Sequence, residues 1–440
     1  MKKKLRLDSS QIIPLSFLAA IAVGTLLLLL PISNVSGRGD FMTSLFTSTT
    51  SVCVTGLVTV DTFAHWTAFG KAVILVLIQL GGLGIVTVTS SLLIFFNRKL
   101  TLGDRLLIQD TFNLTSVKGL GAFLRKVLIF TFVSEGIGAA LYLPVFIRDL
   151  GVGKGIWQAV FTSVSAFCNA GIDVMGPDSL ARYAHSPLVL ITTMLLIVTG
   201  GLGFVVWFDL FGRDRKRLGE HTKTVIAVTL SLILIGAAVI FVSERNNPQT
   251  LGNMSVGGKI LNSLFESVTF RTAGFSTFPQ AGLGPGSVLL GSALMFIGGS
   301  PVGTAGGIKT VVLAIVAANA LSFIRGRNDT VLFKRRVSTA VIRKSTAIFS
   351  VSLAAALLIT LALILTEGLS LSDGLFESFS AIGTVGLSRG VTPSLGTAGQ
   401  LIIILGMYLG RIGPISMAIF FSGDDSANRV KVAEGTFFAG

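Results

Sequence analysis

The sequence predicts an all-α integral membrane protein with eight transmembrane helices and four re-entrant half-helices. Three observations support this fold class: the composition is apolar, eight apolar spans run through the chain, and one unit of sequence occurs four times. Of the 440 residues, 51% are hydrophobic and 13% are charged, whereas soluble proteins carry about 25% charged residues. The mean hydropathy is +0.80. This composition excludes a soluble enzyme, a disordered chain and a disulfide scaffold.

The apolar spans occur in pairs. They cover residues 12–33, 70–96, 121–147, 187–211, 222–243, 286–322, 340–366 and 396–421. The first is too long for a signal peptide, and no cleavage site follows it, so we expect a retained membrane helix. A semi-polar stretch separates the two spans of each pair, at 41–62, 156–178, 257–278 and 371–392. Its helical part is too short to cross a bilayer, which needs about 20 residues, so we expect a half-helix and a returning loop.

The basic residues predict the orientation of these spans. Of 35 Lys and Arg residues, 24 lie before the first span, after the last span, or at 97–126, 213–223 and 325–344. Cytoplasmic loops carry such an excess of basic residues. We therefore expect a multi-pass protein of the cell membrane with both termini in the cytoplasm and the half-helices entering from outside. The net charge of +14 then needs no nucleic-acid partner.

The fourfold repeat is the strongest pattern in the chain. Each semi-polar stretch contains a phenylalanine that is followed 9 or 10 residues later by a glycine. These pairs are Phe46 and Gly56, Phe161 and Gly171, Phe265 and Gly274, and Phe376 and Gly386. Each second span contains a glycine cluster, at 81–84, 200–203, 298–299 and 410–413. We expect four units, at 12–97, 120–212, 222–323 and 339–421, and a cytosolic tail at 422–440. Helix, half-helix and helix of each unit would surround one pore with pseudo-fourfold symmetry.

The loop after each half-helix predicts a binding site for an alkali cation. Non-helical backbone at membrane depth is tolerated where it lines a water-filled cavity, and its carbonyl oxygens can replace the hydration shell of a cation. A glycine permits the positive φ that such a loop needs. The residues expected to line this filter are Val54, Thr55, Gly56, Asn169, Ala170, Gly171, Thr272, Ala273, Gly274, Thr384, Val385 and Gly386. The fourth loop is most similar to the Thr-Val-Gly sequence of potassium filters.

Two features of the second spans stand out. The third unit reads GGSPVGTAGGIKT from Gly298 to Thr310, and its proline and five glycines predict a broken helix. The other three second spans are expected to be continuous. The last span contains Arg411, and a charge within a membrane usually faces a pathway or a partner. The break can instead be a packing kink between helices. Arg411 can instead form a structural pair with a buried carboxylate. Glu266 and Glu377 can cap their half-helices or bind ions.

The repeated units, filter glycines and glycine clusters together resemble the Trk/Ktr/HKT superfamily of cation transporters, and most of all the membrane subunits of bacterial Ktr systems. The resemblance implies potassium uptake with K⁺ as the permeant ion, Na⁺ as a coupling or activating ion, and no covalently bound cofactor. It implies a homodimer docked on a cytosolic ring of KtrA-type nucleotide-binding subunits. It assigns Gly303, Thr304, Ala305, Gly306 and Gly307 to a gate loop below the filter. Arg411 would face the cavity near that loop.

Two other classes of function fit the sequence less well. An alternating-access carrier usually has inverted repeats and broken spans in both halves, whereas here the repeat is fourfold and parallel and one broken span is expected. An enzyme would need a nucleophile–base pair or a metal cluster, and the residues suggest neither. The three histidines are scattered and suggest no metal site. At the first filter position, serine in plant relatives is associated with sodium selectivity. Gly56 therefore favours potassium.

Overall fold

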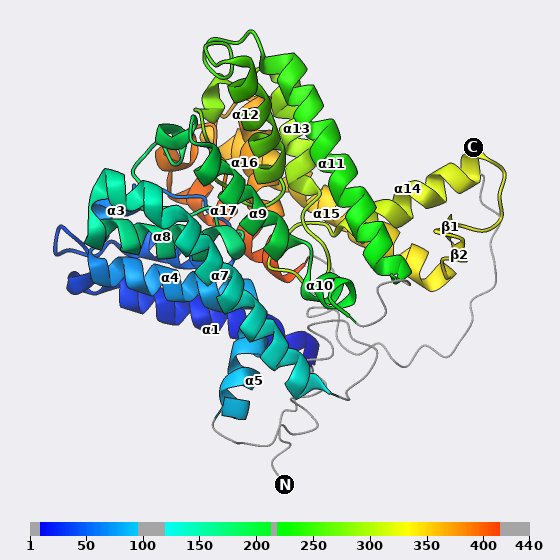
Figure 1. Ribbon diagram of the computed structural model, residues 1–440, viewed down its shortest axis with the longest axis horizontal. Helices are drawn as coiled ribbons and strands as arrows, with labels where there is room; N and C mark the ends of the chain where they lie inside the picture. The colour runs from blue at the N-terminus through cyan, green and yellow to red at the C-terminus, as the bar shows by residue number, and fades with distance from the viewer. Residues whose placement is uncertain (1–8, 96–118, 213–217, 414–440) are drawn as a thin grey trace.

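The computed structural model describes residues 9–95, 119–212 and 218–413. It is helical throughout, apart from a two-stranded hairpin of β1 (Val331–Leu332) and β2 (Arg335–Arg336). The loop at 97–118 and the tail at 422–440, to which the sequence assigned a cytoplasmic position, lie outside these residues. Figure 1 shows long helices leaning against one another around shorter central ones.

Each unit begins with one continuous helix. These helices are α1 (Ser9–Leu29), α7 (Leu120–Leu150), α11 (Glu220–Glu244) and α15 (Thr339–Glu367). All four are long and apolar enough to cross a membrane. The expected first span of each unit is therefore present as a single helix. Two of them contain a proline, Pro14 and Pro144.

A half-helix follows in each unit. These elements are α2 (Phe41–Val52), α8 (Val152–Phe167), α12 (Val256–Thr269) and α16 (Leu371–Gly383). Side-chain oxygens cap three of them at the N-terminus, as Ncap residues commonly do. The backbone N–H donors and their acceptors are Thr43 to Asp40 (2.7 Å), Gly258 to Ser255 (3.2 Å) and Asp373 to Ser370 (3.1 Å). Short connections follow the loops, namely α3 (Thr62–His65), η2 (Ala181–Tyr183), η3 (Gln280–Gly282) and η4 (Thr392–Ser394).

The second spans differ from the prediction. They consist of α4 (Ala68–Leu83) with α5 (Ile85–Phe95), α9 (Pro187–Gly201) with α10 (Phe204–Leu210), α13 (Pro285–Phe296) with α14 (Thr310–Ile324), and α17 (Thr397–Ile412). The third is interrupted as expected. The prediction that it alone is broken is wrong. The helices α9 and α10 meet at 98°, and Gly84 separates α4 from α5.

In three of the four glycine clusters, the last glycine marks the point where a helix ends. Gly84, Gly203 and Gly413 have φ values of 84°, 89° and 94°, a conformation that ends a helix and that glycine adopts without strain. The sequence analysis expected these glycines to lie within continuous spans. In these three units the backbone leaves the helix at the end of the cluster, whereas in the third unit α13 ends at Phe296, before Gly298.

A serine two residues after the leading phenylalanine attaches each half-helix to the first helix of its unit. The Oγ atoms of Ser48, Ser163 and Ser267 donate to main-chain carbonyls of α1, α7 and α11 at 2.6–2.7 Å. In each case a glycine of that helix faces the serine, at Gly24, Gly138 and Gly236. In the fourth unit Ser378 bonds the Thr360 hydroxyl instead, at 2.5 Å. The half-helices therefore have equivalent positions within their units.

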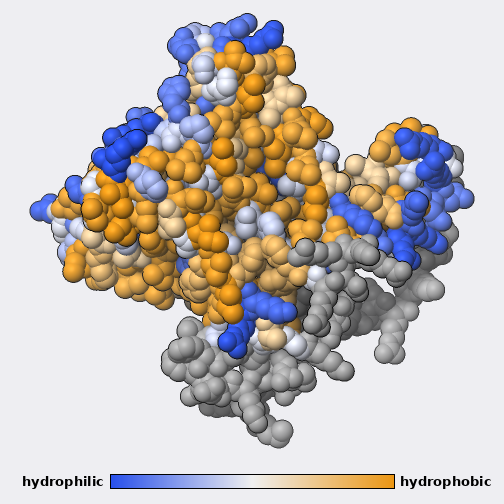
Figure 2. Space-filling view, in the orientation of Figure 1, coloured by the Kyte–Doolittle hydropathy of each residue, from blue (hydrophilic) through white to orange (hydrophobic). Residues whose placement is uncertain are grey.

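The exterior of the molecule is apolar. Large hydrophobic side chains are exposed along every long helix, among them Leu26, Phe132, Leu234 and Leu365. Figure 2 shows apolar residues across most of the visible face, with hydrophilic residues gathered towards its ends. Soluble proteins do not expose an apolar surface of this extent, whereas a bilayer solvates it. The chain is a multi-pass membrane protein.

Candidate ion pathway

The four loops that the sequence predicts to form a filter, here called the filter loops, have the same backbone conformation. Their first residues, Val54, Asn169, Thr272 and Thr384, have φ values of 51–69°. Their glycines, Gly56, Gly171, Gly274 and Gly386, have φ values of 64–103°. Non-glycine residues adopt positive φ rarely and at an energetic cost. The same unusual geometry four times indicates that each loop presents its carbonyl groups in one defined way.

The four loops meet in a closed ring. Next to each glycine, where a Cβ atom would lie, is the carbonyl oxygen of the residue that precedes the glycine of the next unit. A Cβ at Gly56 would lie 2.5 Å from Ala170 O, and one at Gly171 would lie 2.6 Å from Ala273 O. Gly274 faces Val385 O, and Gly386 faces Thr55 O, which returns the sequence of contacts to the first unit. Segments more than 300 residues apart are therefore neighbours around one axis.

Hydroxyl groups of the half-helices hold these loops from behind. Thr50, Ser165, Thr269 and Ser380 each lie four residues after the leading phenylalanine. Two of them accept from the backbone N–H of a filter glycine, Thr50 from Gly56 (2.9 Å) and Ser380 from Gly386 (3.1 Å). The other two donate to the carbonyl one residue further on, at Ile172 and Phe275 (2.5 and 2.6 Å). This set was not predicted from the sequence, although all four hydroxyl residues occupy one repeat position.

The loop that interrupts the third second span lies against the filter. Thr304 Oγ1 donates to the carbonyl of Phe167, at the end of α8, at 2.9 Å. It also lies 3.0 Å from Oδ1 of the filter residue Asn169. Gly306 faces the side chain of Thr384, the first filter residue of the fourth unit, with no room for a Cβ. This loop thus contacts two of the four filter segments.

Neighbouring backbone fixes the rest of the loop. Gly303 faces Gly200 O, where a Cβ would lie 2.8 Å away, and Ala305 contacts Gly299. Gly307 has a φ of 64° and lies beside Gly298. All five residues assigned to a gate loop therefore lie together, against backbone of the second and third units.

Two cations hold adjacent carbonyls of this loop. Arg411 Nη1 donates to Thr304 O at 2.6 Å, while its Nη2 donates to Gly81 O and, at 3.4 Å, to Gly82 O. Lys309 Nζ donates to Ala305 O at 2.7 Å. Within the described residues, Arg411 forms no ion pair with a carboxylate. The guanidinium connects the fourth unit, the interrupting loop and the glycine cluster of the first unit.

Arg271 and the two half-helix glutamates have structural partners. Arg271 Nη2 donates to Gly298 O at 3.3 Å, next to the interrupting loop. Glu266 accepts from the Gln280 side chain at 3.3 Å, and Glu377 from Thr392 at 2.8 Å and from Ser388. Both glutamates therefore hold the chain that leaves the filter, rather than the half-helix N-terminus. Among the residues that the structure describes, no three His, Cys, Asp or Glu side chains form a metal-binding group.

Comparisons with known proteins agree with this architecture. The sequence matches the TrkH family, described as cation transport protein, over residues 6–430. It is 35% identical over 439 residues to the Ktr system potassium uptake protein B of Bacillus subtilis, covering 100% of this chain and 98% of the relative. It is 36% identical to the potassium/sodium uptake protein NtpJ of Enterococcus hirae, covering 98% of this chain and 96% of the relative. These identities confirm the resemblance to Ktr proteins.

The fold is also that of a solved transporter. The crystal structure of the potassium transporter TrkH from Vibrio parahaemolyticus superposes with a TM-score of 0.76 at 16% identity, covering 96% of this chain and 86% of that one. The sequence match spans nearly the whole chain, and the ring of four loops lies within it. The chain belongs to the TrkH family of cation transport proteins.

Proposed function

We propose that this protein takes up potassium across the bacterial cell membrane through the ring of four loops. The observation that carries the proposal is the closed sequence of contacts between each filter glycine and the carbonyl of the next unit. Carbonyl oxygens gathered around an axis replace the water around an alkali cation. The half-helices end at this ring, so their negative dipole ends also favour a cation. One relative is named a potassium uptake protein and the other a potassium/sodium uptake protein, and K⁺ is the ion common to both names.

The filter would consist of the twelve residues predicted from the sequence. In every loop, positive φ at the first and third positions alternates with negative φ at the second. This alternation supports carbonyls that point to one axis, because successive peptide planes then turn the same way. Buried hydroxyls behind the ring restrict its width, and a defined width is one means of distinguishing K⁺ from the smaller Na⁺.

The interrupting loop would be the gate. Thr304 and Gly306 of this loop contact filter residues, and hydrogen bonds that can exchange with water attach the loop, rather than a continuous helix. Arg411 would close the pathway in two ways, by holding the loop and by placing a permanent charge beside the path of a cation. Opening would require the loop to leave Phe167 and Arg411 to release Thr304.

The membrane topology follows from the same arrangement. We propose that the four continuous helices and the four broken or shorter second spans each cross once, which makes eight spans and four half-helices. Both termini would lie in the cytoplasm, as the basic loops indicate. The protein would act as a homodimer on a cytosolic ring of KtrA-type nucleotide-binding subunits, with Na⁺ as a coupling or activating ion. Full-length similarity to proteins of Ktr systems supports these partners.

Ion uptake into proteoliposomes tests the proposal. The purified chain is reconstituted, a voltage is imposed, and the fluxes of K⁺, Na⁺ and a panel of organic solutes are compared. Voltage-driven K⁺ flux that exceeds Na⁺ flux supports the filter. Ion-coupled flux of an organic solute would contradict it and would favour a carrier. The several broken second spans are also compatible with a carrier.

A further inference from the structure

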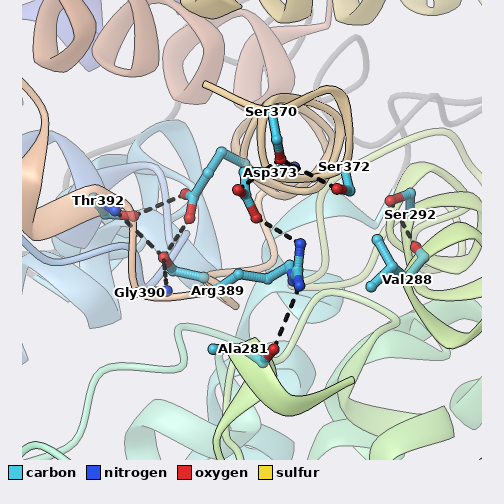
Figure 3. A network of polar contacts seen from close by, with 11 residues as sticks. Ala281, Val288, Ser292, Ser370, Ser372, Asp373, Arg389, Gly390 and Thr392 are labelled. Carbon is cyan, nitrogen blue, oxygen red and sulfur yellow. Dashed lines mark hydrogen bonds and ion pairs between the residues drawn. The ribbon is translucent and has the colours of Figure 1, made fainter. Parts of the chain in front are cut away.

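An ion pair lies at the outer end of the fourth loop (Figure 3). Arg389 is the third residue after the filter glycine Gly386, and its Nη1 lies 2.5 Å from Oδ1 of Asp373. Asp373 is in the first turn of α16, where its other carboxylate oxygen accepts from the Ser370 hydroxyl at 2.7 Å. The two side chains are only 16% and 28% exposed. The pair is therefore well positioned and partly shielded from water.

The pair belongs to a double attachment of the loop. One turn after Asp373, Glu377 accepts a hydrogen bond from Ser388, the residue before Arg389. Two acidic side chains on one face of α16 thus hold two consecutive residues of the chain that leaves the filter. Arg389 Nη2 reaches further, to Ala281 O of the third unit at 3.4 Å. In Figure 3 the guanidinium lies between Asp373 and Ala281.

The charge of Arg389 has no counterpart in the other loops. Three residues after the other filter glycines the chain has Thr59, Val174 and Thr277. The Cα atom of Arg389 can lie no more than about 11 Å from that of Gly386 along the chain. An exposed charge acts over about one Debye length, roughly 8–10 Å. An unpaired guanidinium here would therefore repel cations that approach the filter.

We propose that Asp373 neutralises Arg389, so that the guanidinium can hold the outer end of the fourth loop without opposing cation entry. Both are positioning residues, since neither is one of the filter residues. The proposal rests on the proposed function, because it requires cations to reach the filter past this end of the loop. It adds a charge balance at the mouth of the pathway that is independent of the gate loop.

The test uses two single variants. If the pair only holds the loop in place, both variants lower uptake, whereas if Asp373 neutralises Arg389, only the loss of Asp373 lowers it. Initial K⁺ uptake is measured in proteoliposomes at low ionic strength and at K⁺ concentrations below saturation. Asp373→Asn leaves the guanidinium unpaired, and we expect it to lower the rate about twofold, as one charge about 11 Å away in water would do. Arg389→Gln removes the charge, and we expect a rate equal to or above that of the wild type. An impermeant salt at high concentration should abolish the difference.

Controls separate charge from folding. Asp329→Asn makes the same change in the exposed pair with Arg336 of β2, and we expect no change in uptake. The double variant Asp373→Arg with Arg389→Asp restores a neutral pair, and we expect it to regain most of the lost rate even if one single variant folds poorly. Equal losses in both single variants, or a loss that salt does not alter, would overturn the charge balance. Absence of K⁺ flux in the wild type would overturn the proposed function as well, and the same assay reports it.

Discussion

Arg411 and Thr304 are joined by a 2.6 Å hydrogen bond across 107 residues of sequence. The bond attaches the last described helix, in the fourth unit, to the loop that interrupts the third. Because Thr304 in turn bonds Phe167 and Asn169 in the second unit, and Arg411 also bonds Gly81 in the first, one short network includes all four units. The loop cannot leave the filter without breaking it.

Arg411→Gln should increase voltage-driven K⁺ flux. The substitution removes both the charge in the pathway and a charged hydrogen bond, which contributes about 1.5–3 kcal/mol. A loss at the lower end of this range shifts the open population by about tenfold. The measurement is K⁺ flux per protein in proteoliposomes. Arg411→Lys keeps the charge but has a single donor group, so an intermediate flux is expected if the loop is held by bonds, and a wild-type flux if charge alone matters.

Thr304→Val should also raise K⁺ flux without altering the preference for K⁺ over Na⁺. Valine preserves the shape of the side chain but loses the hydroxyl that bonds Phe167 O and Asn169 Oδ1. One neutral hydrogen bond contributes about 1 kcal/mol, which corresponds to roughly a fivefold change. Thr366→Val is the matched control, because its hydroxyl makes only a local bond on an exposed face of α15. An unchanged flux in Thr304→Val would make the loop a packing element.

Shortening residues 303–307 should have a related effect. If these five residues close the pathway, their partial removal raises K⁺ flux and leaves selectivity unchanged, since no filter residue is altered. Flux and the K⁺ to Na⁺ ratio are measured in the same vesicles. A fall in selectivity would instead indicate that Gly306 supports the filter through Thr384.

Gly56→Ser should weaken discrimination against Na⁺. The backbone has a φ of 103° there, and a Cβ would lie 2.5 Å from Ala170 O, closer than real contacts allow. The loop must shift, which alters the spacing of the carbonyls around the axis. Gly37→Ser is the control, because Gly37 has a similar positive φ of 67° but open space around it. Retention of the wild-type K⁺ to Na⁺ ratio in Gly56→Ser would count against Gly56 as a filter residue.

Ser380→Ala tests the hydroxyls behind the ring. It removes the acceptor for Gly386 N–H and leaves a partly buried donor unpaired, at a cost of about 1–3 kcal/mol. We expect a lower K⁺ to Na⁺ ratio with little loss of protein. Ser394→Ala, in an exposed turn, should have no effect. Equal ratios in the two variants would show that the hydroxyl does not maintain the filter.

Much of this arrangement is predictable from the sequence, because a fourfold repeat reveals equivalent positions without an alignment of relatives. The Phe-to-Gly spacing predicted the positions of the half-helices and the loops. The proline and glycines after Gly298 predicted the break in the third unit. The breaks at Gly84 and Gly203 were not predicted, since a glycine in an apolar span is compatible with a continuous helix and only the backbone angles reveal the difference.

Long-range partners were harder to predict than positions. The sequence suggested that Arg411 faces the interrupting loop, but its second bond, to Gly81, depends on the closure of the ring between the first and fourth units. Glu266 and Glu377 were expected near half-helix N-termini, where capping is common. Their true partners are residues beyond the filter, which local periodicity cannot identify. The pairing of Asp373 with Arg389 was missed for the same reason.

The most direct test of the central claim is to locate a bound cation. The protein is crystallised in a rubidium or thallium salt, and anomalous scattering marks the ion. Density on the axis of the ring, equidistant from the carbonyls of Thr55, Ala170, Ala273 and Val385, is the predicted result. Density elsewhere in the membrane region, with none at the ring, would contradict the claim that these four loops form one ion-binding filter.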